Sequence, residues 1–415
     1  MTEQDYYLGF SVFPGVGAVR FQLLLSSFGS AKTSWTATEK ELRVVLKNKV
    51  TEEFLKFRET FDITSYKRIL LEKGVSFVTL DEAEYPQKLK DLKKPPFVLY
   101  VKGNKKILNH PSTLLRVKVQ DDTTNGHPGA QAIGSQKDSI SPSGFQNDNE
   151  YNPSTPLRFA QGRNYIGIVG TRKVTSYGRQ ITETFTRELV DQGFIVVSGL
   201  ALGVDAISHQ TTVDAGGKTI AVLGCGVDCC YPSSNQELYN QILETNGAII
   251  SEYPLSANPN KGSFPSRNRI IAALSQGLLV TEGAEDSGSL ITAGIALDLG
   301  RTVFAVPGPV TSSLSRGPLK LIRKGAKLVT SGEEMLEELG IGTEGQGDKA
   351  KKEIKGETEE EQRIIDCLIN EDLGFDEIVK KTNIAASTLG GILSMMEVKG
   401  IVCFTNNAYA LKHTF

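Results

Sequence analysis

Short apolar runs that end at glycine alternate with helical periodicity through the middle of the chain. Residues 165–170 form a run rich in β-branched side chains that stops at a glycine, as strands buried in a parallel sheet do. Ile181, Phe185 and Leu189 then recur at four-residue spacing until a glycine ends the helical pattern. Residues 194–198 form a second buried run that again leads into a glycine-rich turn and a helix. Two consecutive strand-to-helix crossovers predict a doubly wound α/β sheet.

The alternation of strand and helix continues toward residue 340. Further strands are expected at residues 75–80, 219–223, 248–251, 278–281 and 302–306. The last four of these runs end in a polar or glycine-bearing loop. The pattern therefore predicts a sheet domain over residues 73–340. Ligands of such sheets bind at the carboxyl ends of the strands, so those loops are the candidate site.

The first 72 residues have a different, helical pattern. Residues 8–25 are apolar and helical apart from a break at Phe13-Pro14-Gly15-Val16-Gly17, and short helices are expected at 35–46 and 54–61. Two helices joined by such a turn resemble a helix-hairpin-helix (SAM-like) module, whose turn amides can hold a DNA phosphate. An ordinary turn between helices explains the pattern equally well. We expect a small α domain over residues 1–72.

Residues 110–163 differ sharply in composition from their surroundings. They are rich in Ser, Asn, Gln, Asp, Gly and Pro and poor in aliphatic residues, so they cannot bury enough apolar surface to offset their ordering entropy. Their two ends nearly repeat each other, since residues 111–116 and 153–158 differ at one position. We interpret the segment as a disordered insertion; a functional flexible arm is the alternative.

The C-terminal part predicts a linker at 341–358 and a winged helix at 359–415. Three helical patterns precede a hairpin at 402–411 around Asn406-Asn407. A helix that enters a DNA groove needs cations, yet none lies between Lys381 and Lys399 in the third helix. A protein-interaction or regulatory role is therefore favoured over groove binding.

Composition narrows the class of protein. The chain has 415 residues, 39% of them hydrophobic, and a net charge of -2, so a nucleic-acid surface requires local clustering of cations. The five cysteines are odd in number and form no C-x-x-C pair, which favours reduced thiols over disulfides or zinc. Without a long apolar run or a signal-like N-terminus, we expect a cytoplasmic protein that does not enter a membrane.

The first strand end carries the residues expected to bind phosphate. Gly170 would let a phosphate approach the backbone, the following helix would offer free N–H groups, and Arg172 and Lys173 supply cations. The turn lacks the G-x-G-x-x-G spacing of a dinucleotide site. Gly217-Lys218-Thr219 imitates the tail of an ATPase P-loop but leads into a strand, so that class is rejected as well.

Two stretches without acidic residues indicate a polyanion groove. No acid lies between Glu252 and Glu282, where Lys261, Arg267 and Arg269 surround an apolar Phe264. Residues 299–332 also lack acids and carry six cations. Phenylalanine among cations is typical of single-strand binders, in which bases stack on aromatic rings. A scatter of solvated surface cations is the alternative.

Seven motifs in order resemble the DNA-processing protein A family (DprA, also called Smf). They are IVGTRKVTSYG, VVSGLALGVDAISH, IAVLGCGVDCCYP, ISEYP, FPSRNRIIAALS, SGSLITA and FAVPG. The resemblance covers residues 75–340 apart from the insertion. It implies an extended Rossmann-like fold that binds single-stranded DNA without sequence preference, forms a homodimer and loads the RecA recombinase during natural transformation.

The resemblance also assigns roles to individual residues. The DNA-binding residues it implies are Gly170, Arg172, Lys173, Gly199, Lys261, Phe264, Arg267, Asn268, Arg269, Ser287, Gly288 and Ser289. Lys261 to Arg269 would form a strand-binding loop, Gly224 and Gly226 would shape a pocket, and Asp205 would cap a helix. The family tends to have asparagine where this chain has Leu319, which puts a polar contact there in doubt.

Catalysis has little support in the sequence. His209 is the only histidine of the sheet domain outside the insertion, Ser198 lacks a G-x-S-x-G context, and no cluster has metal-ligand spacing, so no cofactor or metal is expected. A phosphoribohydrolase-like enzyme on the same fold is the alternative, although its P-G-G-x-G-T-x-x-E motif is absent. A protein that senses a small nucleotide in the same pocket is a third possibility.

Overall fold

The computed structural model describes residues 1–109, 164–341, 356, 358–369, 371–399, 401–405 and 408–411. The chain divides into two compact units, Met1–Gly342 and Thr343–Phe415, each described separately below. The predicted insertion at 110–163, nearly all of the predicted linker and the Asn406-Asn407 turn lie outside the described residues.

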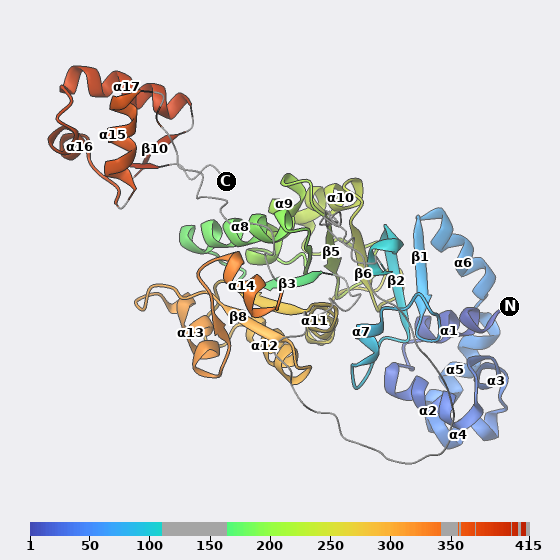
Figure 1. The fold of residues 1–415 in the computed structure, drawn as a ribbon. Coiled ribbons are helices and arrows are strands. Elements are labelled where there is room, and N and C mark those ends of the chain that lie inside the picture. Colours follow the sequence, from blue (N-terminus) through green and yellow to red (C-terminus); the bar gives the residue numbers. More distant parts are fainter. Residues whose placement is uncertain are drawn as a thin grey trace, which may run out of the picture. The chain divides into compact units, whose positions relative to one another are not determined.

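Nine strands form one sheet in the first unit, in the spatial order β1-β2-β6-β5-β4-β3-β7-β8-β9 (Figure 1). The strands are β1 Val75–Thr79, β2 Val98–Gly103, β3 Tyr165–Val169, β4 Ile195–Ser198, β5 Thr219–Val222, β6 Ala248–Ser251, β7 Gly277–Val280, β8 Thr302–Ala305 and β9 Lys327–Leu328. The strands from β6 to β9 in this spatial order are parallel, and β2 pairs antiparallel with β6 and with β1. The predicted doubly wound, mostly parallel α/β fold is confirmed.

The central strand β3 sets the position of the site. Ile166 pairs with Val196 of β4 on one side and with Gly277 of β7 on the other. The chain moves outward from β3 through β4 and β5 to β6, then returns to the other side of β3 as β7. The winding direction therefore reverses between β3 and β7, and the carboxyl ends there form the crevice in which open α/β sheets bind ligands.

Helices cover both faces of the sheet. They are α7 Gln87–Lys90, α8 Ser176–Asp191, α9 Val204–Asp214, α10 Gln236–Glu244, α11 Ser263–Leu274, α12 Gly288–Asp298, α13 Arg316–Arg323 and α14 Gly332–Glu338. Ile271 of α11 and Leu321 of α13 are buried in one core cluster together with Val169. Phe185 of α8 and Met335 of α14 are buried in another together with Ile166. Alternate residues of β3 thus enter two different cores, because successive side chains of a strand point to opposite faces.

The N-terminal helices share a core with the sheet. They are α1 Glu3–Val12, α2 Ala18–Phe28, α3 Ala31–Thr36, α4 Glu39–Leu46, α5 Asn48–Thr60 and α6 Ile63–Glu72. Phe21 stacks on Phe97 with ring centroids 4.0 Å apart, and the same apolar cluster contains Tyr100 and Ile249 of the sheet. Residue 72 therefore marks a change of architecture within one compact unit. The helix expected at 35–46 is two helices, because Thr38 accepts a hydrogen bond from the Glu41 amide and caps α4.

The second unit consists of three helices and a two-stranded antiparallel sheet. Its elements are α15 Glu359–Leu368, α16 Phe375–Thr382, α17 Ala386–Val398, β10 Val402–Thr405 and β11 Ala408–Leu411. Leu389 and Leu393 of α17 pack with Ile364, Ile378 and Val402 in its core. This element order is compatible with the winged helix, which stays a prediction. Among the described residues of either unit, no helix is both long enough and apolar enough to span a bilayer.

Candidate nucleic-acid interface

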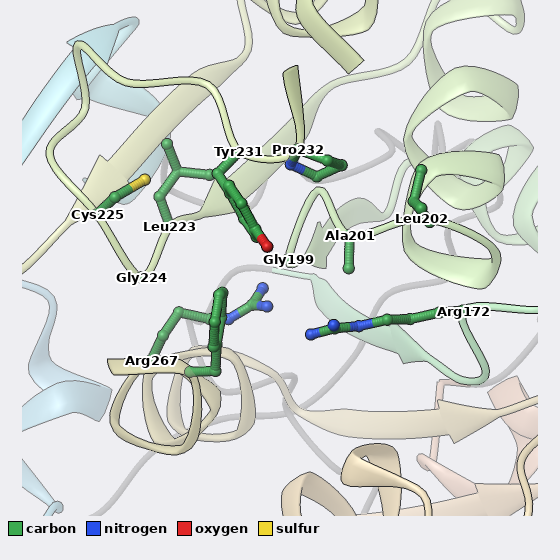
Figure 2. Close-up of a pocket in the computed structure, with 11 residues that line it drawn as sticks. Arg172, Gly199, Ala201, Leu202, Leu223, Gly224, Cys225, Tyr231, Pro232 and Arg267 are labelled. Carbon is green, nitrogen blue, oxygen red and sulfur yellow. The ribbon is translucent and has the colours of Figure 1, made fainter. Parts of the chain in front are cut away.

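Two adjacent hollows open at the carboxyl ends of β3, β4 and β5. The first hollow is lined by Arg172, Gly199, Ala201, Leu202, Leu223, Gly224, Cys225, Tyr231, Pro232, Phe264 and Arg267 (Figure 2). The second hollow, of about 260 Å³, is lined by Val169, Gly170, Arg172, Ala201, Asp205, Phe264, Pro265, Arg267, Asn268, Ile271, Ser287, Gly288, Ser289, Ile291 and Thr292. Arg172, Ala201, Phe264 and Arg267 line both, so the hollows share a wall.

Nine of the predicted site residues line these hollows: Gly170, Arg172, Gly199, Phe264, Arg267, Asn268, Ser287, Gly288 and Ser289. Gly170 and Ser289 are distant in sequence but meet here, because the carboxyl ends of the parallel strands lie on the same edge of the sheet. Three predicted residues, Lys173, Lys261 and Arg269, are outside both linings. Contact with DNA stays a prediction for all twelve.

Two backbone amides at the G-T-R turn are bonded within the protein. The Thr171 amide donates to the Glu282 carbonyl at 2.7 Å, and the Lys173 amide donates to the Thr171 hydroxyl at 3.1 Å. The Glu282 carboxylate occupies the N-terminus of α8, where it accepts hydrogen bonds from the Thr175 amide and hydroxyl at 3.0 and 2.6 Å. The carboxylate therefore occupies part of this helix end, and phosphate binding by the remaining N–H groups stays a prediction. The exposed Arg172 side chain is a further group available to a phosphate here.

Gly170 serves close packing. A Cβ atom at this position would lie 2.7 Å from the Glu282 carbonyl oxygen and 2.5 Å from a methyl carbon of Val204. Both contacts are closer than van der Waals packing permits, so a side chain would separate β3 from α9 and from the end of β7. Gly170 lines the second hollow, and its lack of a side chain lets β3, α9 and the end of β7 pack closely there.

An arginine and two aromatic rings form the exposed part of the site. The Arg172 guanidinium carbon lies 5.5 Å from the ring centroid of Phe264, a cation–π arrangement. The rings of Phe264 and Tyr231 are 5.7 Å apart and tilted by 38°. Tyr231 keeps 46% of its surface exposed, and Figure 2 shows it pointing with Arg172 into the first hollow. Sequence reasoning missed Tyr231, although a tyrosine before proline after the Gly224–Gly226 turn was an available signal.

Arg267 is buried and acts from beneath the site. Only 5% of its surface is exposed; Nη1 donates to the Val222 carbonyl at 3.0 Å and lies 3.9 Å from the Asp205 carboxylate. A Cβ atom at residue 199 would lie 1.3 Å from Nη1, so the arginine passes through space that only glycine leaves open. Burial lowers the pKa of Arg267, and Asp205 counteracts this effect. Each partner of the pair offsets part of the other's desolvation.

Asp205 does not cap a helix. It is the second residue of α9, whose N-cap residue is Gly203, and its carboxylate accepts a hydrogen bond from the Gly199 amide at 3.2 Å. Burial raises the pKa of Asp205, whereas Arg267 and the hydrogen bonds from backbone amides lower it. The predicted capping role is replaced by a positioning role, since Asp205 fixes both Gly199 and Arg267.

The expected strand-binding loop is mostly helical. Residues from Ser263 onward form α11, and only Lys261, which is exposed, precedes it. Successive residues of a helix point about 100° apart, so the motif divides between two sides. Arg267 and Asn268 face the second hollow, whereas Arg269 forms an ion pair with Glu252. The loop prediction was wrong because a proline in the first turn of a helix, Pro265 here, does not interrupt it.

The N-terminus of α12 forms the far wall of the second hollow. Ser287 is its N-cap residue and accepts a hydrogen bond from the Ser289 amide at 3.3 Å. The two serine hydroxyls lie 2.8 Å apart. The cations of the second acid-free stretch line neither hollow, and two of them, Lys320 and Lys327, form ion pairs with glutamates. The basic groove predicted from that stretch is therefore not part of this site.

Within the described part of the chain, no group of three or more His, Cys, Asp or Glu side chains could hold a metal ion. His209 is fully buried behind the site, and burial lowers its pKa to about 3. The surfaces of the hollows offer cations, hydroxyls and aromatic rings, which are groups that can contact phosphates and bases.

Residues 76–115 and 156–340 match the sequence profile of the family described as DNA recombination-mediator protein A. The chain belongs to this family. The profile leaves out residues 116–155, which fall within the predicted insertion. One relative is the DNA processing protein DprA of Bacillus subtilis, which is 34% identical to this chain over 319 residues. The match covers 76% of this chain and 90% of that protein.

The solved structure of one relative agrees with the fold. The X-ray structure of DprA from Streptococcus pneumoniae superposes with a TM-score of 0.59 at 27% identity, covering 81% of this chain and 98% of that one. The structure of DprA from Helicobacter pylori, described for its single-stranded DNA binding mode, gives a TM-score of 0.46 at 29% identity, covering 64% of this chain and 95% of that one.

Proposed function

We propose that this chain binds single-stranded DNA in the two hollows without reading its sequence and acts as a recombination mediator. The observation that carries the proposal is the arrangement of Arg172, Phe264 and Tyr231 at the point where the sheet changes winding direction. Membership of the DNA recombination-mediator protein A family supports the same function.

The chemistry of the hollows suits any single strand. Arg172 can pair with a phosphate, and the exposed ring of Tyr231 can stack on any base because every base has a π-face. Stacking and phosphate contacts do not read base edges, so sequence preference should be weak. We expect the strand to leave chemically unchanged, since the described residues of the hollows include no nucleophile paired with a base.

Binding without chemistry has to act through another protein. We propose that the bound strand is handed to the RecA recombinase and that the chain works as a homodimer. Two linked sites raise the effective concentration of the second contact, so a dimer would hold a longer strand more tightly than one subunit does. The location follows from the partners and is expected to be the cytoplasm.

The second unit is proposed to bind protein. The exposed residues of α17 between Ala386 and Val398 include Ser387, Thr388 and Met395, and they include no cation. Helix α15 begins with the exposed Glu359 and Glu360, which would repel a DNA phosphate. A regulatory or docking role therefore suits this unit better than groove binding.

Strand binding can be tested by charge reversal at Arg172. We expect Arg172→Glu to weaken binding of a labelled dT oligonucleotide at least about tenfold, because a repelled phosphate replaces an attracted one. Arg179→Glu is the matched control, since Arg179 is exposed on the neighbouring helix α8 and lines neither hollow. Wild-type affinity should decline with added salt, since phosphate neutralisation releases counterions. Equal affinities for wild type and Arg172→Glu would overturn the proposal.

The mediator role has its own test. We expect the protein to shorten the lag of RecA ATPase activity on DNA already coated with single-strand-binding protein, and Arg172→Glu not to shorten it. An unchanged lag with wild-type protein would remove the mediator role but leave strand binding intact. Release of a free base from a nucleoside monophosphate by the protein alone would favour the phosphoribohydrolase alternative.

A further inference from the structure

The two hollows differ in chemistry although they share a wall. The first is bounded by apolar and aromatic side chains, among them Leu202, Leu223 and Tyr231. The second combines the hydroxyls of Ser287 and Ser289 and the amide of Asn268 with apolar side chains such as Ile271 and Ile291. Arg172 and Arg267 line both. One nucleotide has the same division, with a flat apolar base at one end and an anionic phosphate at the other.

The second hollow has two independent features of an anion site. Helix α12 is 11 residues long and its N-terminus lines the hollow, where the partial positive charge of the helix end favours an anion, although the Ser289 and Leu290 amides already donate to Ser287. A Cβ atom at Gly288 would meet nothing within 4 Å, so access to this helix end is open. Arg267, which is 5% exposed and lines the same hollow, has a buried Nε–H without a protein partner.

The charge of the second hollow matches a phosphate monoester better than a diester. Two guanidinium groups, the Asp205 carboxylate and the helix end, worth roughly half a positive charge, leave a net charge of about plus one and a half. A phosphate monoester carries about −1.5 to −2 at neutral pH and has three free oxygens, whereas a diester inside a strand carries one charge and has two. One of the Ser287 and Ser289 hydroxyls donates to the other, which leaves one O–H donor for the third oxygen.

We infer that the two hollows together form a site for one nucleoside 5′-monophosphate, with its base in the first hollow against Tyr231 and its phosphate in the second at the N-terminus of α12. The ligand is a free mononucleotide or the phosphorylated 5′ end of a strand. The inference rests on the proposed function, and it adds that the site distinguishes a terminal phosphate from an internal one.

The first experiment places a fluorescent reporter in the base hollow. The chain has one tryptophan, Trp35, buried among the N-terminal helices, so Tyr231→Trp adds a single reporter at the site. We expect dTMP to quench the new fluorescence by stacking and to bind at least tenfold more tightly than thymidine or inorganic phosphate. The wild-type protein, which carries only Trp35, should show no change. Inorganic phosphate binding as tightly as dTMP would overturn the inference, because the base hollow would then contribute nothing.

The second experiment separates the 5′ end from free mononucleotide and from general strand binding. Wild-type protein is titrated with a dT oligonucleotide carrying a 5′-phosphate or a 5′-hydroxyl. We expect at least fivefold tighter binding of the phosphorylated form, and we expect dTMP to compete for that difference. If both oligonucleotides bind equally and dTMP does not compete, the inference fails and the proposed function stands. If neither oligonucleotide binds, the proposed function itself fails.

Substitution of Ser287 and Ser289 tests whether the preference for a 5′-phosphate arises at the N-terminus of α12. The double variant Ser287→Ala, Ser289→Ala should lose most of the preference for the 5′-phosphate, measured within the variant as the ratio of its affinities for the 5′-phosphate and the 5′-hydroxyl oligonucleotide. Ser266→Ala is the matched control, because Ser266 lies on α11 outside both linings. A preference that survives loss of both hydroxyls and is equally strong in Arg267→Lys would place the phosphate elsewhere and overturn the inference.

Discussion

His209 is held as a neutral imidazole by its hydrogen bonds. Its Nε2 accepts from the Leu200 amide at 3.3 Å, so this nitrogen carries no proton. Its Nδ1 lies 2.7 Å from the Thr219 hydroxyl, which itself donates to the Val196 carbonyl at 2.8 Å, so Nδ1–H must be the donor. Protonation would break the contact with Leu200 in the turn that leads to the site. Burial and the nearby Arg267 charge both lower the pKa of His209, to about 3.

Stability should therefore fall as the pH decreases below about 6.5, the pKa of an unfolded histidine. Below this pH the histidine of the unfolded chain is protonated, whereas His209 in the folded chain stays neutral down to about pH 3. The free energy of unfolding therefore declines between these two pH values. We expect a loss of about 2 kcal/mol between pH 7 and pH 5 from this group. Urea unfolding of wild type and His209→Gln should show the pH dependence reduced by that amount in the variant. Parallel pH profiles would contradict the assignment.

Gly199 decides whether Arg267 can stay in place. A methyl group there would occupy the position of the guanidinium, since the Cβ would lie 1.3 Å from Nη1. We expect Gly199→Ala to lower the free energy of unfolding by about 3–5 kcal/mol, because it separates a buried ion pair, and to abolish strand binding. Gly294→Ala is the control: a Cβ at this position in α12 meets nothing within 4 Å, and the change should be neutral or stabilising. A stable Gly199→Ala protein with normal affinity would show that Arg267 is dispensable.

At the scale of the elements, Glu282 joins the end of β7 to the start of α8. The carboxylate is buried and stands where a phosphate would stand in a dinucleotide-binding protein of similar topology. A Cβ atom at Gly178 would lie 2.0 Å from Glu282 Oε2, so glycine in the first turn of α8 makes room for it. The Glu282 carboxylate therefore lies at the N-terminus of α8, and the second hollow is lined instead by residues of α11 and α12.

Glu282→Gln should weaken this junction. The glutamine side chain has one oxygen, so it cannot accept from the Thr175 amide and hydroxyl through two oxygens as the carboxylate does. The negative charge that interacts with the helix end is also lost. We expect a loss of about 1–2 kcal/mol in urea unfolding at pH 7. The control Glu183→Gln removes an exposed charge further along α8 and should cost less than about 0.5 kcal/mol. Equal effects of the two changes would remove the special role of Glu282.

At the scale of the whole molecule, we expect the predicted insertion to contribute little to folding or binding. Its composition lacks core-forming residues, and the family profile leaves out most of it. Lengthening a loop costs little, because loop-closure entropy grows only logarithmically with length. We expect a chain that lacks residues 110–163 to keep its affinity for a dT oligonucleotide and a Tm within a few degrees of wild type.

A second deletion variant guards against a strained junction. A short Gly-Ser linker in place of residues 110–163 should behave like the direct joint of Asn109 to Asn164. If both variants lose stability or strand affinity, the segment has a structural or functional role, which was the alternative interpretation of the sequence.

Local patterns determined most of the strands, most of the helices and the α/β class of this protein. Buried strands are continuous apolar runs, and helices repeat their apolar residues with a period near 3.6, so both are visible in a few neighbouring residues. The motifs also identified most residues that line the hollows, because glycine turns at strand ends are local features. The prediction of phosphate binding at the G-T-R turn and the following helix N-terminus also rested on local sequence features.

Tertiary structure decided what those residues can do. Glu282, remote in sequence from α8, fills its N-terminus; Arg267 is buried through Gly199 and Asp205; and Tyr231 reaches the first hollow from another loop. Each outcome depends on two or more distant segments meeting at one edge of the sheet, and local propensity carries no information about such encounters. The sequence determined which residues gather at the site, and long-range packing determined which of their charges and amides remain open to a ligand.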